Sequence, residues 1–176
     1  MTIALVIAGI VVVAVAIVLI VAAMKPDIFS IQRTRRIEAA PERVFPLIND
    51  VHEFIKWSPF EKDPNMKRTF RGPSAGPGMI YEFDGNRNVG AGRVEVTESH
   101  PVSKIVMRLV MLRPFAADNT VVFTLAPSAG GTDVTWQMSG KQPFMAKVMS
   151  TIINCDRMVG GEFDKGLTSL NTLAIK

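Results

Sequence analysis

The chain has 176 residues, of which 48% are hydrophobic, and a formal net charge of +4. This modest charge comes without a basic stripe interleaved with aromatic residues, which argues against nucleic acid as a partner. The only cysteine, Cys155, cannot form an internal disulfide, and His52 and His100 lie far apart without H-E-x-x-H or C-x-x-C spacing. We therefore expect no metal site and no cofactor.

The N-terminal segment is expected to cross a membrane. Ile3 to Met24 contains no charged residue and no hydrogen-bonding side chain. As a helix, about 22 residues reach about 33 Å, enough to cross a hydrocarbon core of about 30 Å. A cleaved signal peptide is the alternative, with Ala22-Ala23 as its one hint of a cleavage site, but no Lys or Arg precedes the run. We assign residues 1–26 to an anchor with its juxtamembrane segment and residues 27–176 to one domain.

Charges that flank this segment predict its orientation. Lys25, Arg33, Arg35 and Arg36 follow the apolar run, whereas no basic side chain precedes it. The positive-inside rule therefore places the C-terminal domain in the cytoplasm, at what we expect to be a bacterial inner membrane.

The domain begins with a predicted strand and two short helices. Phe29 to Ile37 reads as a strand at a sheet edge, or a bulged one, because Arg33 and Arg35 share a face with the isoleucines at positions 31 and 37. A short helix starts within residues 40–45, with a proline in its first turn, and a second is expected at residues 54–57.

Apolar and polar residues then alternate with a period of two. The alternating runs cover residues 79–84, 93–97, 105–111, 121–125 and 134–139, and turn-forming Gly, Pro and Asn residues separate them. Strands joined by short turns predict an antiparallel sheet with one apolar face.

The last element returns to a helical period. Apolar residues from Met145 to Ala174 fall within one stripe about 60° wide when each residue turns by 100°. This pattern predicts one helix of about thirty residues, whose stripe has to be covered by the apolar face of the sheet. The fold class is therefore α+β, with a long helix on a curved antiparallel sheet.

Short segments over residues 30–174 carry a family resemblance through their order and spacing. They are Ala40-Pro41-Glu42-Arg43-Val44-Phe45, Trp57-Ser58-Pro59-Phe60-Glu61, Gly76-Pro77-Gly78, Gly90-Ala91-Gly92, Gly131-Thr132-Asp133-Val134-Thr135-Trp136, and Gly160 with Phe163 and Gly166-Leu167. With the order strand, two short helices, six strands and a long helix, the chain resembles the START-like (SRPBCC, Bet v 1-type) helix-grip superfamily, in its bacterial polyketide cyclase/dehydrase branch. The resemblance implies about seven strands wrapped on the C-terminal helix, around a deep cavity for a hydrophobic small molecule.

The inward-facing aromatic and methionine residues are the candidate cavity wall. They are Tyr81, Phe83, Met107, Met111, Phe123, Trp136, Met138 and Met149. Plain core packing is the alternative, but ten methionines in a small domain favour an adaptable cavity. By the resemblance, Trp57 lies near the cavity mouth, either as a lid or as simple packing.

Asp156 breaks the apolar stripe of the last helix. A carboxylate there requires a partner or water. It could pair with a cation such as Arg108 or with a backbone amide, it could line the cavity and bind the polar end of a ligand, or the helix could kink near Gly160-Gly161 so that Asp156 reaches water. Asp156 and Arg108 complete the list of candidate ligand-binding residues.

No arrangement of residues typical of catalysis is present in the sequence. The leading hypothesis is a membrane-tethered binding or carrier domain for a lipid, an isoprenoid or a polyketide-like molecule. One alternative is a cyclase or dehydratase in which Asp156, Tyr81 or Arg108 moves protons. Another is an interaction module with a filled core and an exposed apolar patch.

Overall fold

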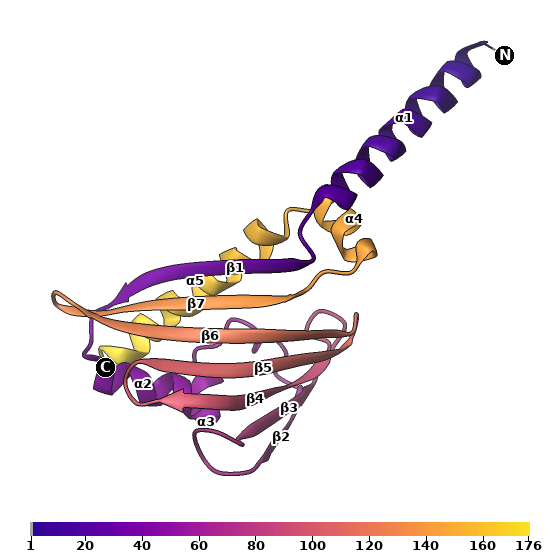
Figure 1. The fold of residues 1–176 in the computed structure, drawn as a ribbon. Helices are drawn as coiled ribbons and strands as arrows, with labels where there is room; N and C mark the ends of the chain where they lie inside the picture. Colours follow the sequence, from indigo (N-terminus) through magenta and orange to yellow (C-terminus); the bar gives the residue numbers. More distant parts are fainter. Residues whose placement is uncertain (1) are drawn as a thin grey trace.

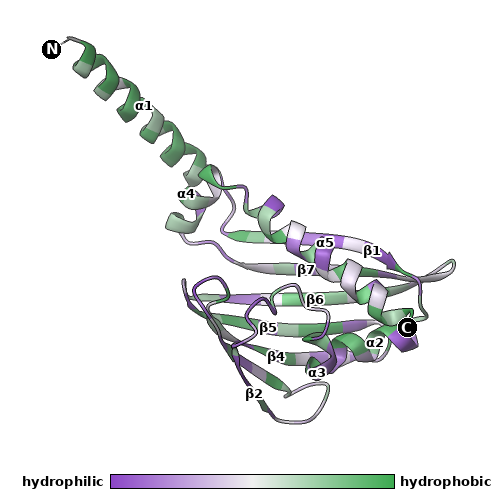
Figure 2. Ribbon diagram, turned by 180° about the vertical axis from the view of Figure 1, so that it is seen from behind, coloured by the Kyte–Doolittle hydropathy of each residue, from purple (hydrophilic) through white to green (hydrophobic). Residues whose placement is uncertain are grey.

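The computed structural model describes residues 2–176, except for the side chain of Thr2. Its first element, helix α1 (Thr2–Met24), projects away from the remainder of the chain (Figure 1). Apolar residues cover α1 over its whole length (Figure 2), and its Ile3–Met24 segment reaches a mean hydropathy of 3.5. In length and composition α1 suffices to cross a membrane, although a signal sequence meets the same criteria.

Seven antiparallel strands form one curved sheet in the order β1-β7-β6-β5-β4-β3-β2. The α+β helix-grip architecture expected from the sequence is therefore confirmed, and β1 lies at a sheet edge as predicted. The strands are β1 (Ile28–Ile37), β2 (Lys67–Arg71), β3 (Ile80–Asp84), β4 (Ala91–His100), β5 (Lys104–Arg113), β6 (Ala117–Ser128) and β7 (Gly131–Lys141).

Two short helices follow β1 and pack against the inner face of the sheet. Helix α2 (Pro41–Asn49) starts at a proline, whose missing N–H costs nothing in the first turn, and it buries Val44 and Ile48. Helix α3 (Val51–Phe54) begins where the Asp50 carboxylate accepts a hydrogen bond from the His52 backbone N–H at 2.8 Å. The second short helix is therefore three residues earlier than predicted.

The prediction of one long C-terminal helix is wrong, because the segment forms two helices, α4 (Phe144–Ile152) and α5 (Cys155–Ala174). Ile153 has an extended backbone, and the side chain of Asn154 accepts a hydrogen bond from the Arg157 backbone N–H at 2.9 Å. This cap starts a new helix. Only α5 lies across the sheet, whereas α4 packs against the end of α1 (Figures 1 and 2).

The core fills the space between α5, the two short helices and the concave face of the sheet. Its centre is aromatic: Trp136 of β7 stacks on Phe163 of α5 with ring centroids 4.3 Å apart. The close approach of α5 to β7 requires a glycine in the helix, because a Cβ at Gly166 would lie 2.7 Å from the Trp136 ring.

Strand register brings several turns to one end of the sheet. Ile28 at the start of β1 pairs with Lys141 at the end of β7. Gly140 pairs with Asn119, near the β5–β6 turn, and Arg113 pairs with Ala91, which follows the β3–β4 turn. These turns and the start of β1 therefore lie at the same end, which we name the α1 end because α1 leads directly into β1 there (Figure 1).

Candidate ligand cavity

A cavity of about 560 Å³ lies between α5 and the concave face of the sheet. Pockets of about 300–1,000 Å³ are typical of small-molecule sites. Its wall is mainly apolar and includes Phe54, Phe60, Met66, Phe83, Val94, Met107, Leu109, Met111, Val121, Trp136, Met138, Val159 and Phe163.

One wall of the cavity carries a partly buried polar network centred on Glu61. The Tyr81 hydroxyl donates a hydrogen bond to Oε1 of Glu61 at 2.5 Å, and Arg68 donates from Nε to Oε2 at 2.9 Å. Burial raises the pKa of the Tyr81 phenol, and its hydrogen bond to the Glu61 carboxylate raises that pKa further. Tyr81 is therefore a neutral hydrogen-bond donor at physiological pH.

A salt bridge forms a second polar feature of the wall. Nζ of Lys62, in the segment after α3, lies 2.7 Å from Oε2 of Glu162 on α5, and Lys165 donates to the other carboxylate oxygen at 2.9 Å. Burial alone would raise the pKa of Glu162, but the hydrogen bonds and charges of the two lysines outweigh it and lower that pKa. The charged pair ties the segment after α3 to α5 across the cavity wall.

Trp136 contributes its ring to the wall. Its indole Nε1 is buried and has no hydrogen-bond partner among the residues that the structure describes. A buried donor without a partner costs about 1–3 kcal/mol. Because this nitrogen is itself buried, it presents no accessible donor to the cavity.

The structure places part of the predicted set along this cavity. The predicted residues that line it are Tyr81, Phe83, Met107, Met111, Trp136 and Met138. Phe123 and Trp57 lie behind this wall in the core, where Phe123 is fully buried and the Trp57 indole N–H donates to the Leu47 carbonyl at 2.7 Å. Trp57 is therefore packing and not a lid.

Three further predicted residues lie away from the cavity altogether. Arg108 lies on the outer face of β5 and binds Asp118 there, with Nε donating to Oδ1 at 2.9 Å. Met149 belongs to α4, which packs on α1 and not on the sheet. Asp156 is exposed in the first turn of α5, because the chain restarts its helix after Asn154.

Asp156 pairs with a cation other than the one suggested from the sequence. Arg33 of β1 donates from Nη2 to Oδ2 of Asp156 at 3.0 Å, and its Nε lies 3.4 Å from Oδ2 of Asp164. The hydrogen bond from Arg33 lowers the pKa of Asp156, so this carboxyl is ionised and bound outside the cavity. Of the three proton-moving candidates, Tyr81 alone is at the cavity wall in the described chain.

The sequence patterns missed the charged residues of the wall. Glu61 and Lys62 lie in a segment without periodicity, and Glu162 lies beside the apolar stripe of α5. One usable signal was Tyr81, because a phenol predicted to face inward requires a hydrogen-bond partner.

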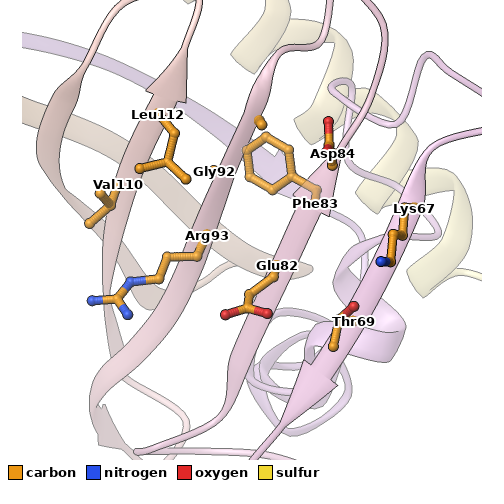
Figure 3. A pocket seen from close by; sticks show the side chains of 10 residues that line it. Lys67, Thr69, Glu82, Phe83, Asp84, Gly92, Arg93, Val110 and Leu112 are labelled. Atoms are coloured by element: carbon orange, nitrogen blue, oxygen red, sulfur yellow. The ribbon is translucent and has the colours of Figure 1, made fainter.

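The outer face of the sheet has its own hollow, of about 580 Å³, over β2 to β5 (Figure 3). Outward side chains of adjacent strands form it, among them Lys67, Glu82 and Arg93. No helix of the described chain covers this face (Figure 1). It is therefore an open surface on which charged and apolar side chains mix, unlike the cavity under α5.

A curved seven-stranded sheet wrapped around a C-terminal helix, with an apolar cavity between the two, defines a START-like, helix-grip protein. Within this class, the chain belongs to the polyketide cyclase/dehydrase and lipid transport family, whose profile matches residues 29–174.

Solved structures agree with this fold. Protein CV1439 from Chromobacterium violaceum is 20% identical, with a TM-score of 0.60 over 82% of this chain and 96% of that one. Protein MLL2253 from Mesorhizobium loti is 19% identical, with a TM-score of 0.57 over 82% and 96%. Ara h 8.0201 is 9% identical, with a TM-score of 0.59 over 84% and 98%. No curated protein matches the chain.

Proposed function

We propose that this domain binds a hydrophobic small molecule, such as a lipid, an isoprenoid or a polyketide-like compound, and carries it at a membrane. The observation that supports this most is the apolar cavity of about 560 Å³ under α5. The family to which the chain belongs includes lipid transport in its description.

The tether in this proposal is α1. Its length and composition suit a membrane span, and the basic residues Lys25, Arg35 and Arg36 follow it without counterparts before it. By the positive-inside rule, the domain then lies on the cytoplasmic side.

A direct test measures bound ligand in the full chain. The chain is purified in mild detergent and analysed by native mass spectrometry with organic extraction, and a defined hydrophobic molecule is expected to accompany it. Val121→Phe fills the cavity from its wall and should lower occupancy, whereas Val122→Phe places the same group on the next residue of β6, outside the cavity lining. Equal occupancy in the two variants, or no ligand under any loading condition, would argue against the proposal.

Tryptophan fluorescence gives an independent readout, because the chain contains only two tryptophans. Trp136 lines the cavity, and the Trp57 ring centroid is 5.6 Å from that of Trp136. A brominated fatty acid that enters the cavity should therefore quench most of the emission. Quenching that is unchanged by Val121→Phe would indicate binding elsewhere.

A second candidate is a cyclase or dehydratase activity, favoured by the Tyr81–Glu61 pair on the cavity wall. The single phenol proton, which Tyr81 donates to Glu61 in the structure, would have to turn from Glu61 to a ligand carbonyl oxygen on which negative charge develops. In that case Tyr81→Phe would retain the ligand and lose its conversion. A ligand recovered unchanged after prolonged incubation with the native protein would argue against the enzyme activity and in favour of the carrier function.

A further inference from the structure

The cavity opens at the α1 end of the sheet. Exposed residues among its lining belong to the β3–β4 turn (Asn88), the β5–β6 turn (Pro114 and Phe115), the first turns of α5 (Met158) and the segment after α3 (Phe60 and Lys62). This last segment adjoins the β3–β4 turn, because the Asn86 backbone N–H donates to Oδ2 of Asp63 at 2.8 Å. Both turns lie at the α1 end by strand register, and α5 starts there because it follows α4. The opposite end of α5 is held at the far end of the sheet, where Asn171 accepts a hydrogen bond from the Glu38 backbone N–H at 2.7 Å.

Large apolar side chains at the α1 end face solvent, one of them in the cavity lining and two on α4. Phe115 is 80% exposed, and Met145 and Ile152 of α4 are each 69% exposed. Such a concentration of exposed apolar residues marks an interaction surface in a folded protein.

Helix α4 is fixed to the end of α1. Nζ of Lys147 lies 2.5 Å from Oδ1 of Asp27, and Nζ of Lys25 donates to the Ser150 hydroxyl at 3.0 Å. Lys147 is the one charged residue of α4 and is only 8% exposed. The remaining surface of α4 is therefore uncharged and adjoins the helix that suits a membrane span.

Charge at this end favours an anionic partner. Four acidic residues of this end, Asp27, Asp84, Asp118 and Asp156, are each bound by a lysine or an arginine. The carboxylate of Asp63 is buried and accepts hydrogen bonds from the backbone N–H groups of Asn65 and Asn86. Arg87, Lys141 and Arg157 belong to the same end and form no ion pair with any residue that the structure describes. These free cations suit anionic lipid headgroups.

We propose that the α1 end docks on the bilayer that α1 crosses, with α4 lying in the interface and Phe115 among the lipids, so that the cavity exchanges its ligand directly with the membrane. The inference rests on the proposed function, because it takes α1 as the anchor and the cavity as the ligand site. An amphipathic helix of this kind lies in the interface when its apolar face is exposed and its charge is turned away.

Depth measurements on the full chain test the docking. In a Cys155→Ser background, single cysteines at Phe115, Met145 and Ile175 carry an environment-sensitive fluorophore, and the chain is placed in nanodiscs of phosphatidylcholine and phosphatidylglycerol. Ile175 is the matched control, since it is exposed and apolar but follows α5 at the far end. Bromolipids should quench the labels at positions 115 and 145, and aqueous iodide should quench the label at 175. Equal responses at all three positions would overturn the proposal.

Uptake kinetics separate docking from ligand binding. Met145→Asp with Ile152→Asp should slow uptake of a brominated phospholipid from vesicles at least about tenfold, which corresponds to about 1.4 kcal/mol, and Ile175→Asp should leave it unchanged. Equilibrium binding of a short brominated fatty acid added from solution should be the same in all these variants. Uptake at the native rate would overturn the docking alone, whereas a native chain that binds neither probe would overturn the proposed function.

Discussion

At the scale of single residues, the Glu61 carboxylate organises the polar side of the cavity. It receives hydrogen bonds from Tyr81 and from Arg68, whose Nη2 lies 2.8 Å from Oε2 of Glu61. Hydrogen bonds to a charged group contribute about 1.5–3 kcal/mol each. The network therefore holds the segment after α3 against β2 and β3, and it fixes the Tyr81 hydroxyl at the cavity wall.

Tyr81→Phe should destabilise the protein by about 1–3 kcal/mol, because the partly buried carboxylate of Glu61 loses one of its donors. Unfolding of the full chain in detergent by urea, followed by fluorescence of the buried Trp57 and Trp136, measures this change. Phe70→Leu, a conservative change in the ring stacked on Tyr81, is a control for packing without loss of a hydroxyl. A stability within error of the native value would mean that the hydrogen bond to Glu61 contributes nothing.

The pH dependence of this site can be read directly, because Tyr81 is the only tyrosine in the chain. Its pKa in the folded state is raised above the ordinary value of 10.0. Its contribution to stability is therefore fully present below pH 10.0 and is lost as the pH rises from there toward the raised pKa. Spectrophotometric titration of the phenolate should show ionisation well above pH 10.0, and Tyr81→Phe should remove the loss of stability. Titration near 10.0 in the folded protein would contradict the partly buried network.

Arg33 shows why part of the site lay beyond sequence reasoning. Alternation correctly placed Arg33 on the inner face of an edge strand, but its partners Asp156 and Asp164 lie on α5, far along the chain. The guanidinium fits beneath the helix because Gly160 has no Cβ to overlap it. Periodicity predicts which face a side chain occupies, whereas it contains no information on which distant charge meets it.

At the scale of elements, two glycines of α5 have opposite surroundings and give a matched pair. A Cβ at Gly166 would lie 2.7 Å from the Trp136 ring and 2.8 Å from Pro59, whereas a Cβ at Gly161 would meet nothing within 4 Å. Gly166→Ala should destabilise the protein by about 1–3 kcal/mol through overpacking. Gly161→Ala should stabilise it by up to about 1 kcal/mol through helix propensity.

Urea unfolding of both variants measures the change in the free energy of unfolding, which is expected to have opposite signs in the two. Both substitutions change helix propensity in the same way, so a difference between them reports the contact of α5 with Trp136. If the two variants shifted stability in the same direction by similar amounts, α5 would not approach β7 as closely as the structure has it.

The strands were predictable from the sequence where one face of the strand packs against the core and the other faces solvent. Residues 79–84, 105–111 and 121–125 alternate cleanly, and each run coincides with a strand, although β3 begins one residue later than its run. Strand β2 has the sequence KRTFR, with hardly any apolar alternation, and was therefore not located. The break between α4 and α5 was missed because the apolar spacing of Met149 and Ile152 continues in phase with α5, although those side chains face solvent.

At the scale of the whole molecule, helix α1 and the cavity opening lie at the same end. The buried core cluster contains no residue of α1, so the domain from residue 27 onward has its own core. The contacts of α1 are mainly with α4, which makes α4 the link between α1 and the domain that contains the cavity. The family match to residues 29–174 covers the same unit without α1.

Removal of α1 should therefore separate folding from membrane attachment. A chain of residues 27–176 is expected to unfold cooperatively and to retain its bound ligand, because every core residue and the cavity wall remain. In flotation with phosphatidylcholine vesicles it should stay in the soluble fraction, whereas the full chain should float. With phosphatidylglycerol vesicles the shortened chain should bind weakly through α4 and the free cations and should be released by salt, because exposed charges are screened within about 10 Å at 0.1 M. Flotation of the shortened chain on neutral vesicles would show that α1 is not the anchor, and loss of cooperative unfolding would show that α1 belongs to the folded unit.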